Sequence, residues 1–146
     1  MVTRIIVGLA LGPAFLAALY FLPPIALAVI VAVIAAMASF ELLRAAKVAH
    51  HNGMYACTAL AAALIPLGHA VGYGSWTTRA VSILLMAALF LPALKHYGTR
   101  SEIRFEHIIV CLFGGVDIPL FLSALVQLKQ FDNGPFYVLL PVICAF

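Results

Sequence analysis

Residues 4–44, RIIVGLALGPAFLAALYFLPPIALAVIVAVIAAMASFELLR, decide the fold of this chain, because they form two long apolar runs with no charge between Arg4 and Glu41. The runs, residues 5–22 and 25–46, are each close to the ~20 residues that a helix needs to cross ~30 Å of hydrocarbon. Backbone groups in lipid must be hydrogen-bonded within their own segment, so each run is predicted to be a helix. Pro23 and Pro24 between them disfavour helical geometry and lack N–H donors. The stretch therefore predicts a transmembrane helical hairpin.

The composition also indicates an integral membrane protein. Hydrophobic residues make up 66% of the chain and charged residues 9%, whereas a soluble domain carries about 25% charged residues. The net charge of +3 is small, and nothing in the sequence indicates nucleic-acid binding. Three cysteines lie far apart in apolar runs, which favours reduced hydrophobic side chains over disulfides or a metal site. A signal peptide is the alternative for the first run, but that run is longer than usual and a second span follows it.

Four more apolar runs follow, separated by polar stretches. They cover residues 54–71, 78–94, 105–128 and 136–146. The last run reaches only about 16 Å as a helix, roughly half of the hydrocarbon thickness. We therefore expect an all-α, polytopic transmembrane bundle with five spans and the truncated start of a sixth. We also expect that the natural protein continues beyond residue 146 and that this chain is its N-terminal part.

The basic residues predict how the bundle is oriented. If the spans alternate in direction, six basic residues fall on one side of the membrane and two on the other. The six are Arg4, Arg44, Lys47, Lys95, Arg100 and Arg104, and the two are Arg79 and Lys129. Because cytoplasmic loops are enriched in Lys and Arg, the bias predicts a cytoplasmic N-terminus.

Three charged residues are candidates for a special role. Glu41 and Arg44 are i, i+3 neighbours on one face at the end of the second span, where they can form a structural pair at the lipid interface or belong to a site. Asp117 falls near the middle of the fifth span, beside two glycines and a proline. A charged Asp there would cost at least ~2.5 kcal/mol, so we expect it to be neutral, paired, or facing protein or water. Both a functional and a packing role stay open for it.

The order of these landmarks resembles a known family. TRIIVGLALGPAFLAALYFLPP, residues 3–24, and the later SFELLR look like the N-terminus of phosphatidate cytidylyltransferases, also called CDP-diacylglycerol synthases. The C-terminal stretch LFGGVDIPLFLSALVQLKQFDNGPFYVLLPVICAF, residues 112–146, resembles the segment that leads into the first motif of that family. Asp117 departs from the pattern, because relatives often have an aromatic or other uncharged residue there.

The resemblance implies a nucleotidyl transfer in the parent enzyme. The phosphate of phosphatidate attacks the α-phosphorus of CTP, pyrophosphate leaves, and CDP-diacylglycerol stays in the membrane for phospholipid synthesis. Such chemistry requires Mg²⁺ held by carboxylates, together with basic side chains. The family provides these in a C-terminal signature of the form S-x-x-K-R-x-x-x-x-K-D. This sequence contains neither the Lys-Arg nor the Lys-Asp dipeptide of that signature. We therefore assign no catalytic, cofactor-binding or metal-binding residue to the chain, and expect it to be inactive alone.

Further expectations concern assembly and location. We expect a multi-pass protein of the bacterial inner membrane, with a homodimer as one conceivable assembly. Two other functions remain alternatives: a small standalone membrane protein, and a transporter fragment in which Asp117 lies in a broken helix along a substrate path.

Overall fold

The computed structural model describes residues 21–48, 52–95, 105–131, 134 and 136–137, and the regular elements among them are all helical. Their bounds are α2 Pro24–Ala45, α3 Asn52–Ala70, α4 Gly74–Lys95, α5 Phe105–Leu112, η1 Phe113–Asp117 and α6 Ile118–Lys129. The last three run on as one rod of 25 residues, in which η1 is a π-helical turn. The predicted all-α class is confirmed for this part of the chain.

Among the described residues, four helices are long and apolar enough to cross a membrane. They are Pro24–Ala45, Gly53–Ala70, Gly74–Lys95 and Phe105–Lys129. They correspond to the second to fifth spans predicted from the sequence. The predicted first span, 5–22, and the start of the sixth, 136–146, lie almost wholly outside the described residues, so the count of five spans and a sixth stays a prediction.

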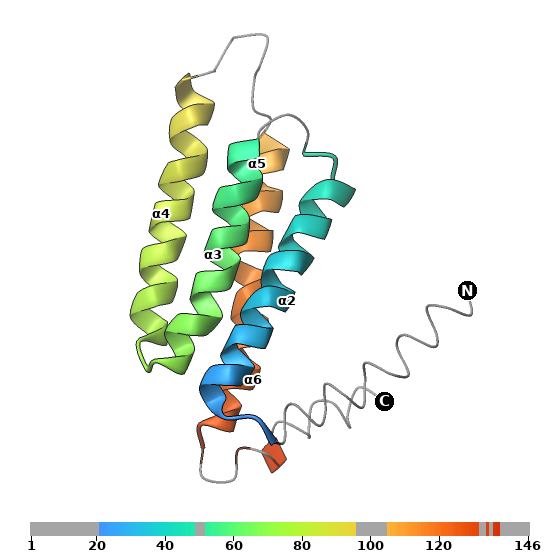
Figure 1. The fold of residues 1–146 in the computed structure, drawn as a ribbon. Coiled ribbons are helices and arrows are strands. Elements are labelled where there is room, and N and C mark those ends of the chain that lie inside the picture. The colour runs from blue at the N-terminus through green and yellow to red at the C-terminus, as the bar shows by residue number, and fades with distance from the viewer. Residues whose placement is uncertain (1–20, 49–51, 96–104, 132–133, 135, 138–146) are drawn as a thin grey trace, which may run out of the picture.

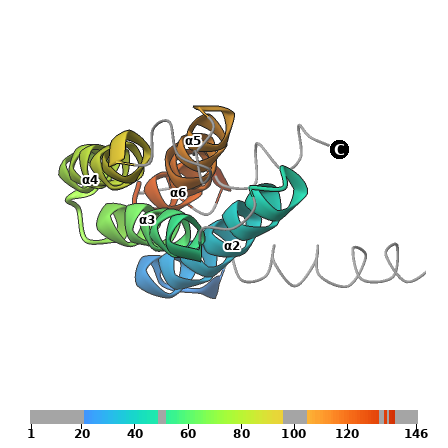
Figure 2. The ribbon, with the colours of Figure 1, turned by 90° about the horizontal axis from the view of Figure 1, so that it is seen from above.

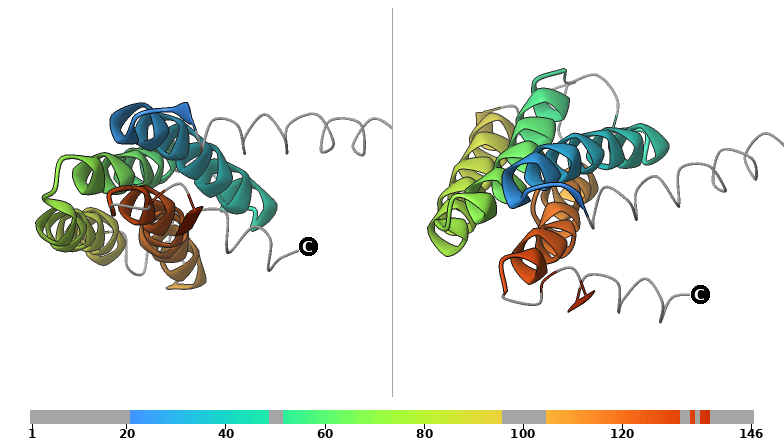
Figure 3. Two further views of the ribbon diagram at one scale, coloured as in Figure 1. Left: turned by 90° about the horizontal axis from the view of Figure 1, so that it is seen from below. Right: turned by 60° about the horizontal axis from the view of Figure 1, so that its bottom comes forward.

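The four rods alternate in direction and lie side by side (Figure 1). α3 has the central place, because it packs against α2, α4 and α6. α4 lies at the edge of the bundle and packs mainly on α3, as the view along the helices shows (Figure 2). Two further views show the same order (Figure 3). Many large apolar side chains face outward, as expected where the solvent is lipid.

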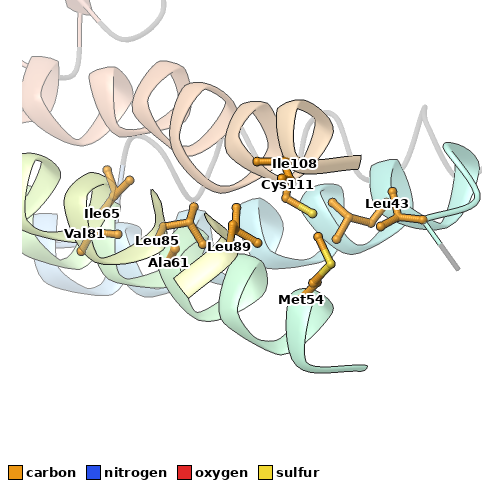
Figure 4. Close-up of a cluster of buried hydrophobic side chains, with 10 residues drawn as sticks. Leu43, Met54, Ala61, Ile65, Val81, Leu85, Leu89, Ile108 and Cys111 are labelled. Atoms are coloured by element: carbon orange, nitrogen blue, oxygen red, sulfur yellow. The ribbon is translucent and has the colours of Figure 1, made fainter. Parts of the chain in front are cut away.

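The core of the described helices consists of two clusters. The larger contains buried residues from α2, α3, α4 and α5, among them Leu43, Ile65 and Leu89. Figure 4 shows the side chains of Leu43, Met54 and Cys111 converging at one end of this cluster. The smaller cluster joins the first half of α2 to α6 through Leu27, Ala28, Val31 and Val126.

A Schellman motif centred on Lys47 ends α2. The Val48 N–H donates to the Leu43 carbonyl at 3.1 Å, and the Lys47 N–H donates to the Arg44 carbonyl at 3.1 Å. Lys47 has φ of 51°, the left-handed conformation that glycine usually adopts at this position. Val48 and Leu43 are both buried in the larger cluster, which is the apolar contact typical of the motif.

A second Schellman motif links α3 to α4. Gly72 has φ of 86°, the Tyr73 N–H donates to the Gly68 carbonyl, and the Gly72 N–H donates to the His69 carbonyl. The Thr77 N–H then donates to the Tyr73 carbonyl at 2.9 Å, so α4 begins at Gly74. The fourth span therefore starts earlier than the predicted residue 78. The gap predicted between the third and fourth runs, residues 72–77, was too long, because one left-handed glycine suffices to reverse the chain.

Candidate functional site

The most unusual local structure is the π-helical turn in the middle of the fifth span. In an α-helix the Ile118 N–H would donate to the Gly114 carbonyl, but here it donates to the Phe113 carbonyl, one residue further back. The next residue, Pro119, has no N–H. The Gly114 carbonyl therefore lacks a donor in either the i+4 or the i+5 position of its own helix. Such an orphaned carbonyl is costly at the centre of a bilayer.

Ser39 of α2 supplies the missing donor. Its side chain is fully buried, and its Oγ lies 2.5 Å from the Gly114 carbonyl and 2.7 Å from the Ala35 carbonyl of its own helix. A hydroxyl has one proton, so these two carbonyls share it or alternate for it. The contact ties α2 to η1 at a point where both backbones are buried in the bundle.

The two glycines of η1 allow this close approach. A Cβ on Gly114 would lie 3.3 Å from a methyl group of Leu43, and a Cβ on Gly115 would lie 2.5 Å from a methyl group of Leu85. Thr58 of α3 also lies against Gly115, with its methyl group 3.2 Å from the same position. Side chains of α2, α3 and α4 thus converge on these two residues, most closely at Gly115, where an added Cβ would force the end of the Leu85 side chain to move. Small residues commonly mark such helix–helix interfaces in membranes.

Asp117 is the last residue of η1 and the central residue of the 25-residue span. Its side chain is exposed, so it points away from the described bundle. The expectation that Asp117 is neutral, paired, or facing protein or water stays a prediction, because a carboxylate facing lipid at this depth is costly. The rod is continuous through η1, so Asp117 lies in a π-helical turn and not in a broken helix.

Glu41 and Arg44 are both exposed near the C-terminal end of α2. In the described part of the chain, Glu41 and Arg44 do not form an ion pair with each other. Arg44 lies in the last turn, where a positive charge is favourable next to the negative end of the helix dipole. Glu41 and Arg44 lie in the last turns of α2, whereas Asp117 is the central residue of the fifth span, so the structure does not bring the three candidates together.

The described residues do not fit a magnesium site. No group of three or more His, Cys, Asp or Glu side chains among them is arranged to hold a metal ion. Mg²⁺ requires several oxygen ligands in near-octahedral geometry. No reaction step is therefore assigned to residues of the four described helices.

The sequence analysis did not identify Ser39 or Lys47 as important residues. Pro119 indicates that a carbonyl about one turn earlier lacks an N–H donor, but the sequence does not say which hydroxyl of another helix serves that carbonyl. Lys47 gave no such signal. Nothing about a lysine predicts left-handed geometry, which becomes apparent only from the Schellman hydrogen bonds.

The fold first defines a broad class, because the four long apolar helices among the described residues are compatible with an integral membrane protein. The chain belongs to the cytidylyltransferase family, whose model matches residues 2–146. The resemblance to CDP-diacylglycerol synthases is thereby confirmed, and the family indicates a nucleotidyltransferase as the parent protein. Comparisons with curated proteins and with solved structures found no match.

Proposed function

We propose that this chain is the N-terminal membrane portion of a phosphatidate cytidylyltransferase. In the proposed reaction a phosphate oxygen of phosphatidate bonds to the α-phosphorus of CTP, the bond to the β-phosphate breaks, and pyrophosphate leaves. The observation that carries the proposal is the family match over residues 2–146, which extends across all four described spans. A lipid acceptor is supported by the same spans, because a membrane-embedded enzyme reaches a substrate that stays in the bilayer.

The role proposed for these helices is to hold the catalytic part at the correct depth of the membrane. Asp117 and Asp132 are the only aspartates of the sequence, and neither matches the family signature. The carboxylates that bind Mg²⁺ are accordingly assigned to a different part of the parent enzyme. Ser39 and the two glycines of η1 serve this role by fixing how α2, α3 and α4 pack on the fifth span.

We place the N-terminus in the cytoplasm of a bacterial cell, with the protein in the inner membrane. α2 and α4 end at the same end of the bundle, and α4 begins and α6 ends at the other (Figure 1). By their positions along these helices, the first end carries the basic residues Arg44, Lys47 and Lys95, and the second carries Arg79 and Lys129. The positive-inside rule then favours a cytoplasmic position for the first end. Accessibility of single cysteines tests this orientation: a reagent that cannot cross membranes should label A46C only in inverted vesicles, and S75C only in intact cells. The opposite pattern would overturn it.

The substrate is tested with the complete native reading frame in proteoliposomes. Labelled CTP and Mg²⁺ are offered with phosphatidate, with diacylglycerol, or with a polyisoprenyl phosphate. The proposal expects a CDP-lipid and an equal amount of pyrophosphate with phosphatidate alone, because diacylglycerol has no phosphate to attack CTP. Product formation only with the polyisoprenyl phosphate would show a different acceptor within the same family.

A further inference from the structure

The outer face of the fifth span carries a stripe of exposed side chains with a carboxyl group at its centre. Ile109, Phe113 and Phe121 are 51%, 49% and 75% exposed. Asp117 lies between the two phenylalanines and is also exposed, and these four residues are called the Asp117 stripe below. No described helix covers this side of α5 and α6, as the view along the helices shows (Figure 2). We propose that a second copy of this chain packs on the Asp117 stripe and that the two Asp117 side chains hydrogen-bond to each other.

The depth of Asp117 in the bilayer calls for a polar partner. It is the central residue of the 25-residue span, so about 18 Å separate it from either end at a rise of ~1.5 Å per residue. Long Lys and Arg side chains can reach the interface from inside the membrane, but the short Asp side chain cannot do so over this distance. Contact with acyl chains alone would leave the carboxyl group without a hydrogen-bond partner, which is unfavourable. Lipid is therefore a poor cover for the centre of the stripe.

The described helices do not supply the partner. Within the residues that the structure describes, Asp117 forms no hydrogen bond or ion pair with another side chain. The hydroxyl groups of Ser39, Thr58 and Ser123 are buried and donate to backbone carbonyls inside the bundle. Because Asp117 faces outward, its partner comes from outside the four described helices.

The two long apolar runs outside the described residues do not supply the partner either. Residues 5–19, IIVGLALGPAFLAAL, contain no side chain that can donate or accept a hydrogen bond. Residues 138–146, VLLPVICAF, contain only the thiol of Cys144, which is a weak donor. A helix formed by either run could cover the stripe with apolar side chains, but it would leave the carboxyl group of Asp117 unpaired. The partner at this depth is therefore assigned to another chain.

A second copy of the chain provides a suitable partner by symmetry. Two copies with the same orientation in the membrane are related by a twofold axis along the membrane normal, so both Asp117 side chains lie at the same depth. A different membrane protein would need a polar side chain at that depth. A carboxyl group that carries its proton donates a hydrogen bond and a carboxyl oxygen accepts one, so two copies of one residue suffice. Such polar contacts commonly join helices within membranes.

This inference goes beyond the proposed function and does not depend on catalysis. Association is measured by energy transfer between donor-tagged and acceptor-tagged 146-residue chains in bilayers, over a range of protein-to-lipid ratios. We expect the natural chain to dimerise and Asp117→Leu to weaken dimerisation at least tenfold. Asp117→Asn should stay within threefold of the natural chain, because an amide also donates and accepts hydrogen bonds. Gln127→Leu is the matched control: it removes another exposed polar side chain of the same span, off the stripe, and should leave dimerisation unchanged.

Disulfide formation between copies maps the contact. Phe113→Cys and Phe121→Cys each place a thiol on the stripe and keep Asp117, so oxidation should cross-link both variants into dimers. Ile83→Cys is the control, because Ile83 is 69% exposed near the middle of α4 and lies off the stripe. It should cross-link at most one-third as much. The natural chain gives the background from its own cysteines, and far-UV circular dichroism verifies that each variant is folded.

Any of four results would overturn the proposal. Equal dimerisation of the natural chain and Asp117→Leu would show that the carboxyl group does not join the copies. A natural chain that stays monomeric at every ratio would show no association. Cross-linking of Ile83→Cys as strong as that of the two stripe variants would show no preferred contact. Cross-linking in the 146-residue chain but not in the complete native reading frame would show that another part of the parent covers the stripe. None of these outcomes bears on whether the parent enzyme uses CTP.

Discussion

At the residue scale, the hydrogen bond from Ser39 to the Gly114 carbonyl has the clearest energetic consequence. Ser39→Ala leaves a buried carbonyl without a donor, and we expect the free energy of unfolding to fall by about 1–2 kcal/mol. Ser82→Ala is the control, because the Ser82 hydroxyl donates only to the Thr78 carbonyl of its own helix. It should change stability by less than about 0.5 kcal/mol. Unfolding in mixed detergent micelles measures both, and equal effects would contradict the role of Ser39.

A substitution at Lys47 is predicted to raise the free energy of unfolding, whereas Ser39→Ala lowers it. A left-handed residue with a side chain costs roughly 1–2 kcal/mol, and glycine recovers part of this despite its larger chain entropy. Lys47→Gly should raise the free energy of unfolding by about 0.5–1 kcal/mol in the same assay. Lys47→Ala keeps the left-handed strain and should not stabilise the protein. Stabilisation by alanine as well would mean that the lysine charge, and not the backbone, is responsible.

At the element scale, the four helices that the structure describes could be predicted from hydropathy, because a lipid solvent requires long apolar segments with internally bonded backbones. Their bounds differ by a few residues, most at Gly74, where the turn proved shorter. The π-helical turn could not be predicted. The hydrogen bond to its Gly114 carbonyl comes from another helix, because Ser39 is 75 residues away in the sequence.

The account of η1 predicts a coupling between two substitutions. Pro119→Ala restores an N–H that can reach the Gly114 or the Gly115 carbonyl, so Ser39 becomes less important. Ser39→Ala should then cost at most half as much in the Pro119→Ala background as in the natural sequence. A double-mutant cycle on unfolding free energies measures this, with an expected coupling of about 0.5–1 kcal/mol. Additive effects would show that Ser39 does not compensate for the proline.

At the scale of the whole molecule, the sequence identified the class and family more completely than it identified a site. Class follows from composition, and the family follows from the order of landmarks along the chain, which the match to residues 2–146 confirms. Neither composition nor the order of landmarks shows which residues form a functional site. Asp117 stands out in the sequence because it is charged in an apolar run, yet its side chain faces outward, away from the residues that hold the described helices together.

The most direct test of the central claim is a turnover measurement on the 146-residue chain itself. The chain is purified, reconstituted with phosphatidate, and supplied with CTP and Mg²⁺, and pyrophosphate release is recorded beside the complete native reading frame. If these helices are the scaffold and the catalytic groups lie elsewhere in the parent, pyrophosphate should appear only with the complete reading frame. Phosphatidate-dependent release by the 146-residue chain alone would contradict the account and place the catalytic groups within these residues.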